Sequence, residues 1–159
     1  MTGLVTAFGS GAMTNSIQDI VNDAEAYFIT GSNTTEQHPV IGIQLRQAVK
    51  RGAKIVLADP RELDLADIAT IHLQQKPGTD VALLNGLMNV IIAEDLWDKE
   101  FVENRTEGFE ELKAAVERYT PEVAQEITGV PAVKIREAAR LLAAAEPASL
   151  LYAMGITQH

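Results

Sequence analysis

Small polar and charged residues follow two apolar segments of this sequence, at positions suited to binding a nucleotide. The turn Gly31-Ser32-Asn33 comes directly after the apolar segment 25–30, and Asp59 and Arg61 come directly after a second one at 53–58. A turn that leads into a helix can present backbone N–H groups to a phosphate. An acidic residue one βα unit later is placed to accept hydrogen bonds from a ribose or a guanine edge. These residues therefore predict a nucleotide site.

Each of these residues also has a purely structural interpretation. The turn is not a GxGxxG fingerprint, and Gly-Ser-Asn turns are common in loops. Asp59 could cap a helix or pair with Arg61, and Arg61 could bind a phosphate or lie solvated. A third loop, 75–80, again combines a cation, a Pro-Gly turn and a candidate helix cap, Thr79 or Asp80. Three such loops at one sheet edge favour the binding interpretation.

No catalytic or metal-binding constellation is recognisable, so we predict no catalytic residue and no metal ligand within the chain. The sequence has no cysteine, which excludes disulfides, thiolate chemistry and cysteine-ligated clusters. His38 suits a ligand contact and a helix start about equally, whereas His72 alternates with apolar residues and is predicted to be partly buried and hydrogen-bonded. The acidic cluster Glu107, Glu110 and Glu111 is predicted to be a solvated helix face.

These loops require an alternating framework of strands and helices. Strands are predicted at 25–30, 53–58, 70–74 and 149–153. The near-continuous apolar character of the first two is typical of a parallel sheet that is covered on both faces. We therefore expect an α/β fold, a Rossmann-like three-layer α/β/α arrangement with a mostly parallel sheet and several C-terminal helices.

Helices are predicted between and after these strands. Pro39 suits a first helical turn, and Gly52 suits the end of the same helix. The segment 1–15 has no clear period and is predicted to be irregular. The predicted helices cover 16–22, 39–51, 79 or 80 to 94, 99–104, 109–118, 122–127 and 131–145.

Composition limits the classes of partner. A chain of 159 residues with 47% hydrophobic residues is expected to form a single domain, residues 1–159. Its net charge of -9 argues against binding nucleic acid. We expect no membrane span, because no segment approaches about 18 consecutive apolar residues. The compartment stays open, with the cytoplasm favoured over the periplasm. A glycine-rich start without a preceding strand, and a polar tail directly after the last strand, which is predicted to be a core strand, predict a domain cut from a longer polypeptide.

Five ordered motifs together resemble the molybdopterin oxidoreductase family. They are FGSGAMTN at 8–15, GSNTTEQHP at 31–39, ADPR at 58–61, KPGTD at 76–80 and YAMGITQH at 152–159. The match extends over essentially the whole chain, and within the family it is most similar to the catalytic alpha subunit of molybdenum- or tungsten-dependent formate dehydrogenases.

The resemblance implies a Rossmann-like domain that holds one of two molybdopterin guanine dinucleotides. The first loop would line the phosphate and pterin side of the groove, the second would meet the guanosine end, the third would close over the nucleotide, and the last segment would approach the pterin. The residues so implied are Gly31, Ser32, Asn33, Glu36, His38, Asp59, Arg61, Gly78, Thr79, Asp80, Met154, Gly155 and Gln158.

The resemblance also implies that the chemistry lies elsewhere in the parent enzyme. The family's metal ligand, its active-site arginine and its iron-sulfur domain would all lie outside this chain, so the fragment alone is expected to be inactive and to carry no bound cofactor. Its partners would be the remaining domains of the parent subunit and electron-transfer subunits. The parent would oxidise formate to carbon dioxide and pass two electrons through iron-sulfur clusters.

Two alternatives remain. A non-catalytic scaffold domain related to the large iron-sulfur subunit of respiratory complex I would keep the fold with a degenerate site, and the polar residues Asn33, Asp59 and Asp80 disfavour it. A generic NAD-binding domain is disfavoured by the missing GxGxxG turn.

Overall fold

The computed structural model of the chain describes residues 2–9, 11 and 13–158. The motif residues Ser10, Ala12 and His159 of the sequence analysis, like Met1, lie outside this part. Its four strands are β1 (Ala26–Thr30), β2 (Lys54–Ala58), β3 (Ile71–Leu73) and β4 (Ala148–Tyr152).

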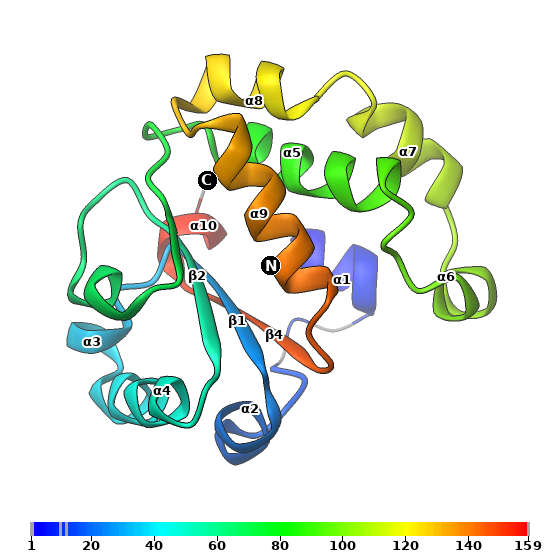
Figure 1. Ribbon diagram of the computed structural model, residues 1–159. Helices are drawn as coiled ribbons and strands as arrows, with labels where there is room; N and C mark the ends of the chain where they lie inside the picture. The colour runs from blue at the N-terminus through cyan, green and yellow to red at the C-terminus, as the bar shows by residue number, and fades with distance from the viewer. Residues whose placement is uncertain (1, 10, 12, 159) are drawn as a thin grey trace.

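The four strands form one sheet in the order β3-β2-β1-β4, and all of its pairings are parallel (Figure 1). Phe28 of β1 is opposite Val56 on one side and Leu150 on the other. The predicted parallel sheet is confirmed. Because parallel strands end at the same edge, the loops that follow them meet there.

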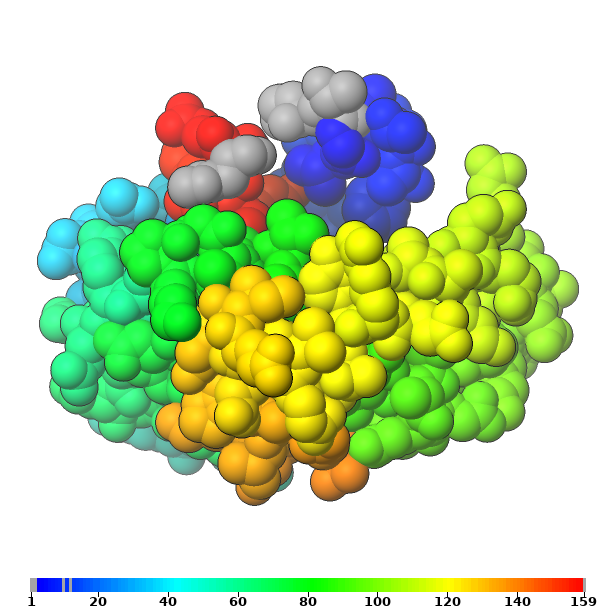
Figure 2. Space-filling view, turned by 90° about the horizontal axis from the view of Figure 1, so that it is seen from above, coloured from blue at the N-terminus to red at the C-terminus, as the bar shows by residue number. Residues whose placement is uncertain are grey.

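Helices lie on both faces of the sheet. The longer ones are α4 (Pro39–Lys50), α5 (Asp80–Ala93), α7 (Phe109–Val116), α8 (Pro121–Thr128) and α9 (Ala132–Ala143). The shorter ones are α1 (Thr2–Phe8), α2 (Ile17–Asp23), α3 (Thr34–Gln37), the 3-10 helix η1 (Asp64–Ile68), α6 (Lys99–Arg105) and α10 (Met154–Thr157). Figure 2 shows the cyan segments of α3 and α4 on the left flank and the yellow-green helices α6 and α7 on the right flank.

Alternate residues of the strands point to two separate cores. On one face Phe28 and Val56 pack with residues of α5, α8 and α9, including Leu83 and Ile135. On the other face the core contains strand and helix side chains that are all buried: Tyr27, Ile29, Ile55, Leu57, Leu45 and Ala48. Both faces of the sheet are therefore covered, which confirms the predicted three-layer arrangement and accounts for the unbroken apolar strands.

Three features near the ends of the chain differ from the sequence prediction. Residues 2–8, predicted to be irregular, form α1, a helix whose sequence TGLVTAF has no sustained apolar stripe to reveal it. The predicted polar tail contains the helical turn α10. The last strand was expected to be a core strand, but β4 pairs only with β1 and its alternate residues are exposed, with Leu150 60% exposed.

Among the residues that the structure describes, no helix is long and apolar enough to cross a membrane.

Candidate functional site

A pocket of about 300 Å³ lies at the carboxyl edge of the sheet. Its walls come from the loops after all four strands, which are far apart in the sequence. The lining residues are Gly31, Asn33, Gln37, Asp59, Pro60, Arg61, Gln75, Pro77, Gly78, Asp80, Met154 and Gly155. This is the edge at which open parallel sheets bind their ligands.

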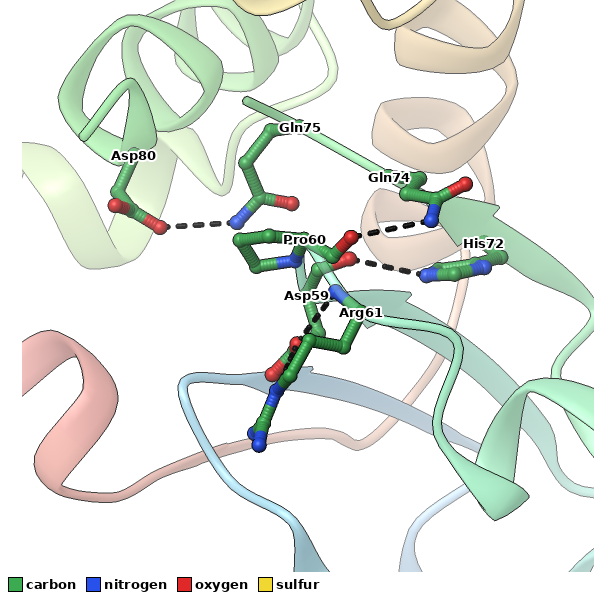
Figure 3. Close-up of polar contacts among 7 residues, drawn as sticks. All are labelled: Asp59, Pro60, Arg61, His72, Gln74, Gln75 and Asp80. Atoms are coloured by element: carbon green, nitrogen blue, oxygen red, sulfur yellow. Dashed lines mark hydrogen bonds and ion pairs between the residues drawn. The ribbon is translucent and has the colours of Figure 1, made fainter. Parts of the chain in front are cut away.

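Asp59 is the buried charge of this pocket, with 3% of its surface exposed. Its Oδ1 accepts hydrogen bonds from the backbone N–H of Arg61 at 2.9 Å and from the Arg61 Nε at 3.3 Å (Figure 3). The ion pair considered from the sequence is therefore present, and helix capping is not. The Arg61 side chain is 66% exposed, so most of its guanidinium stays available to a ligand.

The backbone around Asp59 is held by the neighbouring strand. His72 Nε2 lies 3.1 Å from the Asp59 carbonyl oxygen, and Gln74 Nε2 donates to the Pro60 carbonyl at 3.1 Å (Figure 3). His72 is half-buried, as predicted for a hydrogen-bonded structural histidine. These two bonds fix the β2 loop against β3, so that the Asp59 carboxylate has a defined position.

The loop after β3 places two polar side chains in the pocket. Gln75 is only 2% exposed, and its Nε2 donates to Asp80 Oδ1 at 2.9 Å (Figure 3). Asp80 is the first residue of α5, where the helix dipole favours a negative charge. Gly78 has a φ of 80°, in the region that favours glycine, and makes the turn between them.

Two glycines join the loops after β1 and β4. The Gly155 N–H donates to the Gly31 carbonyl at 3.0 Å. A Cβ added to Gly155 would lie 2.7 Å from the Gly31 Cα, and Gly31 itself has a φ of 58°. Only glycine fits at this contact. It brings the exposed Met154 side chain to the pocket rim.

Five of the predicted site residues do not line the pocket. Ser32 is buried, and its Oγ hydrogen-bonds with Thr34 Oγ1 at 3.1 Å. The Thr79 hydroxyl donates to the Lys76 carbonyl at 2.7 Å instead of capping α5. The other three, all exposed, are Glu36, His38 and Gln158.

Sequence reasoning missed four residues of the lining, namely Gln37, Pro60, Gln75 and Pro77. Gln75 carried a usable signal, because it stands in a loop that was already suspected and directly follows a strand. Its burial was not visible, since a polar residue in a loop is usually exposed.

The chemistry of this arrangement is that of binding. Asp59, Asp80 and Gln75 present hydrogen-bond acceptors, and Arg61 adds a cation at the rim. Within the described part of the chain, no group of three or more His, Asp or Glu side chains could hold a metal ion. The exposed cluster Glu107, Glu110 and Glu111 is the predicted solvated face.

A larger pocket, of about 520 Å³, lies at the opposite, amino edge of the sheet. It contains Arg51 and Lys54 as well as Asp23 and Glu25, so charges of both signs line it. The Arg51 Nη2 donates a hydrogen bond to the Val21 carbonyl oxygen at 2.6 Å. None of the loops predicted to bind a nucleotide reaches this pocket, and we attribute no ligand to it.

The chain is similar in sequence and in structure to known proteins. The family model described as molybdopterin oxidoreductase matches residues 5–159. The chain is 52% identical over 158 residues to the F420-dependent formate dehydrogenase 1 subunit alpha of Methanococcus maripaludis, covering 99% of this chain and 23% of that protein.

Two further relatives show the range of similarity. The chain is 46% identical to formate dehydrogenase H of Escherichia coli, covering 99% of this chain and 22% of that protein. The structure of acetylene hydratase from Pelobacter acetylenicus matches with a TM-score of 0.79 at 43% identity, over 84% of this chain and 18% of that one. This chain therefore spans less than a quarter of the length of the relatives it resembles.

Proposed function

This chain belongs to the molybdopterin oxidoreductase family, and from that premise we propose that it is a cofactor-holding domain of a molybdenum- or tungsten-dependent formate dehydrogenase. The formate dehydrogenases at 52% and 46% identity support this choice within the family. The observation that carries the proposal is the convergence of four strand-end loops on one acceptor-lined pocket.

The residues of the pocket fit a guanine dinucleotide form of the cofactor. Guanine carries N–H donors on its ring and on its exocyclic amino group. The carboxylates of Asp59 and Asp80 can accept hydrogen bonds from these donors. Arg61 and the backbone of the Gly31 and Gly78 turns suit the phosphates, because both offer N–H donors and positive charge or dipole. Met154 and Gly155 would face the pterin.

In this proposal the chain binds and orients the cofactor, and residues elsewhere in the parent enzyme take part in the reaction. When bound, the cofactor supplies the metal that takes up two electrons as formate becomes carbon dioxide. We propose that residues 1–159 act as one domain of a larger catalytic subunit, that iron-sulfur clusters and electron-transfer subunits carry the electrons away, and that the isolated chain has no formate-oxidising activity.

The alternatives account less well for the same residues. A scaffold without a cofactor has no use for Asp59 and Gln75, which are polar and almost fully buried at a pocket. An NAD-binding domain would need close backbone approach at a GxGxxG turn after β1, and the sequence there is GSNTTE.

The proposal is tested on the full-length subunit that contains this chain. We expect reduction of a viologen dye that depends on formate, together with a pterin and GMP released from the protein by acid hydrolysis. A subunit that hydrates acetylene and leaves formate unchanged would contradict the formate assignment. A subunit that releases pterin without GMP would contradict the guanine dinucleotide.

A further inference from the structure

We propose that Gln75 is a ligand-binding residue of the carboxyl-edge pocket, whose side-chain oxygen accepts a hydrogen bond from an N–H group of the bound guanine. The inference rests on the proposed function and adds to it a contact that none of the recognised motifs contains. Gln75 immediately precedes the KPGTD segment and was not among the predicted site residues.

The starting observation is an unpaired polar atom. The Gln75 side chain is 2% exposed, and its Oε1 is buried with no hydrogen-bond partner among the residues that the structure describes. Buried side-chain oxygens are nearly always paired, because an unpaired one gives up its bonds to water and gains nothing in return. Gln75 differs from the other side chains with such an atom, Thr35 and Gln44, in lining the pocket, where a donor on a bound ligand can pair with its oxygen.

The orientation of the amide is fixed by its neighbour. An ionised Asp80 carboxylate only accepts hydrogen bonds, so the Gln75 amide must turn its nitrogen toward it, at 2.9 Å. Figure 3 shows the nitrogen facing Asp80 and the oxygen on the other side of the amide. The free atom is therefore the amide oxygen, which can accept a hydrogen bond from a donor on a ligand.

The surroundings identify the class of donor. Gln75 lines the same pocket as Asp59 and Asp80, so three acceptor side chains lie together there. A phosphate, which offers only acceptors near neutral pH, would be repelled by this set. A base edge with adjacent ring and amino N–H donors is complementary to it. Guanine and pterin share this edge, and the nearness to Asp59 and Asp80 assigns the contact to guanine.

The oxygen can reach such a ligand with little rearrangement. The last torsion of a glutamine side chain has a broad energy minimum, so the amide can rock without a large cost. Asp80, half-buried at the start of α5, keeps one oxygen bonded to Nε2 as this happens.

A matched pair of variants tests the inference in the full-length, cofactor-loaded subunit. Gln75→Met keeps the shape of the side chain and removes both amide atoms. Gln44→Met makes the same change on α4, where the Gln44 Oε1 is also buried and unpaired but does not line the pocket. We expect the guanine-containing cofactor, followed as GMP in acid hydrolysates, to be released about tenfold faster from Gln75→Met, the ratio set by about 1.4 kcal/mol, and at the wild-type rate from Gln44→Met.

Equal release rates for wild type and Gln75→Met would overturn the inference while leaving the proposed function intact. A wild-type subunit without GMP would instead overturn the proposed function, and the inference with it. If Gln75→Met does not fold, the structure of the loaded wild-type subunit decides. A guanine nitrogen within about 3.2 Å of the Gln75 Oε1 supports the inference, and a pterin nitrogen or no donor there overturns it.

Discussion

At the residue scale, the pocket depends on a buried carboxylate whose partners lie within its own loop. Asp59 accepts from the backbone and the side chain of Arg61, and the adjoining backbone is held by His72 and Gln74. Because these bonds occupy one carboxylate oxygen, Oδ1, the side chain keeps further acceptor capacity for a ligand.

Replacing Asp59 by Ala should therefore impair cofactor binding. The variant loses the anchor of Arg61 and one acceptor of the pocket, and we expect the GMP content of the purified full-length subunit to fall at least several-fold. Asp67→Ala, which removes an exposed carboxylate on η1, is the matched control and should keep the wild-type content. Equal GMP in both variants would show that Asp59 is not a cofactor contact.

At this scale the sequence predicted part of the pocket. Eight of the predicted residues line it, because glycine turns and charged residues at strand ends mark the loops: Gly31, Asn33, Asp59, Arg61, Gly78, Asp80, Met154 and Gly155. Gln75 could not be found in this way, since its role depends on burial. Glu36 and His38 are exposed and do not line the pocket, and their contact with a longer ligand stays a prediction.

At the scale of elements, the helices above the sheet pack closely enough to need small residues. Gly86 of α5 faces α8, where an added Cβ would lie 2.7 Å from the Ala124 Cβ and 3.7 Å from the Ile135 Cγ2. Ala124 is fully buried and its Cβ cannot move without its backbone. The position of α5, and with it of Asp80 at its N-terminus, depends on this contact.

Gly86→Ala is expected to destabilise the fold. The clash should cost about 1–3 kcal/mol, and the better helix propensity of alanine should return at most about 1 kcal/mol. Urea unfolding of the purified chain measures the difference. Gly3→Ala in α1 is the control and should be neutral or slightly stabilising, because no described residue other than its own helix backbone and chain neighbours lies within 4 Å of the added Cβ. A Gly86→Ala variant as stable as Gly3→Ala would refute the close packing of α5 on α8.

The ionisation of Tyr27 in β1 should lower the free energy of unfolding at high pH. Burial raises the pKa of the Tyr27 hydroxyl, which donates to the Ile20 carbonyl at 3.0 Å. The folded chain then keeps this proton at pH values where the unfolded chain, with a tyrosine pKa of about 10, has lost it. The contribution of the neutral hydroxyl is therefore complete below about pH 10 and is lost as the pH rises toward the folded-state pKa.

The comparison of wild type with Tyr27→Phe isolates this effect. At neutral pH the variant should be less stable by about 1 kcal/mol, the usual value of a hydrogen bond, and the gap should shrink above about pH 10. Tyr152→Phe makes the same chemical change at an exposed position of β4. A gap between wild type and Tyr27→Phe that stays constant through alkaline pH would contradict the account.

The elements were predictable where their patterns were strong. The strands β1 and β2 and the helices α4, α5 and α9 have long apolar segments or stripes with Pro or Gly close to at least one end, and their predicted positions are confirmed within a few residues. The helix α1 and the edge position of β4 were missed. Whether a strand lies at the edge or in the centre of a sheet depends on the strand order, and no local sequence pattern predicts that order.

At the scale of the whole molecule, the parallel sheet explains why the pocket is where it is. Its strand order, β3-β2-β1-β4, brings residues separated by more than a hundred positions to one edge. The fold class could be predicted because alternating strands and helices admit few arrangements. The proposed substrate does not follow from this fold, since one fold supports many activities. It rests on the family and on the relatives.

The central claim is that this edge of the sheet binds a guanine nucleotide. Backbone amide shifts of the isotope-labelled chain, followed by NMR during titration with GDP and separately with NAD+, test it most directly, because they report weak binding residue by residue. We predict that GDP shifts the amides of Gly31, Asp59, Gln75, Gly78 and Asp80 at the pocket. Unchanged amides there, a stronger response to NAD+, or shifts confined to Arg51 and Lys54 at the amino edge would contradict the claim.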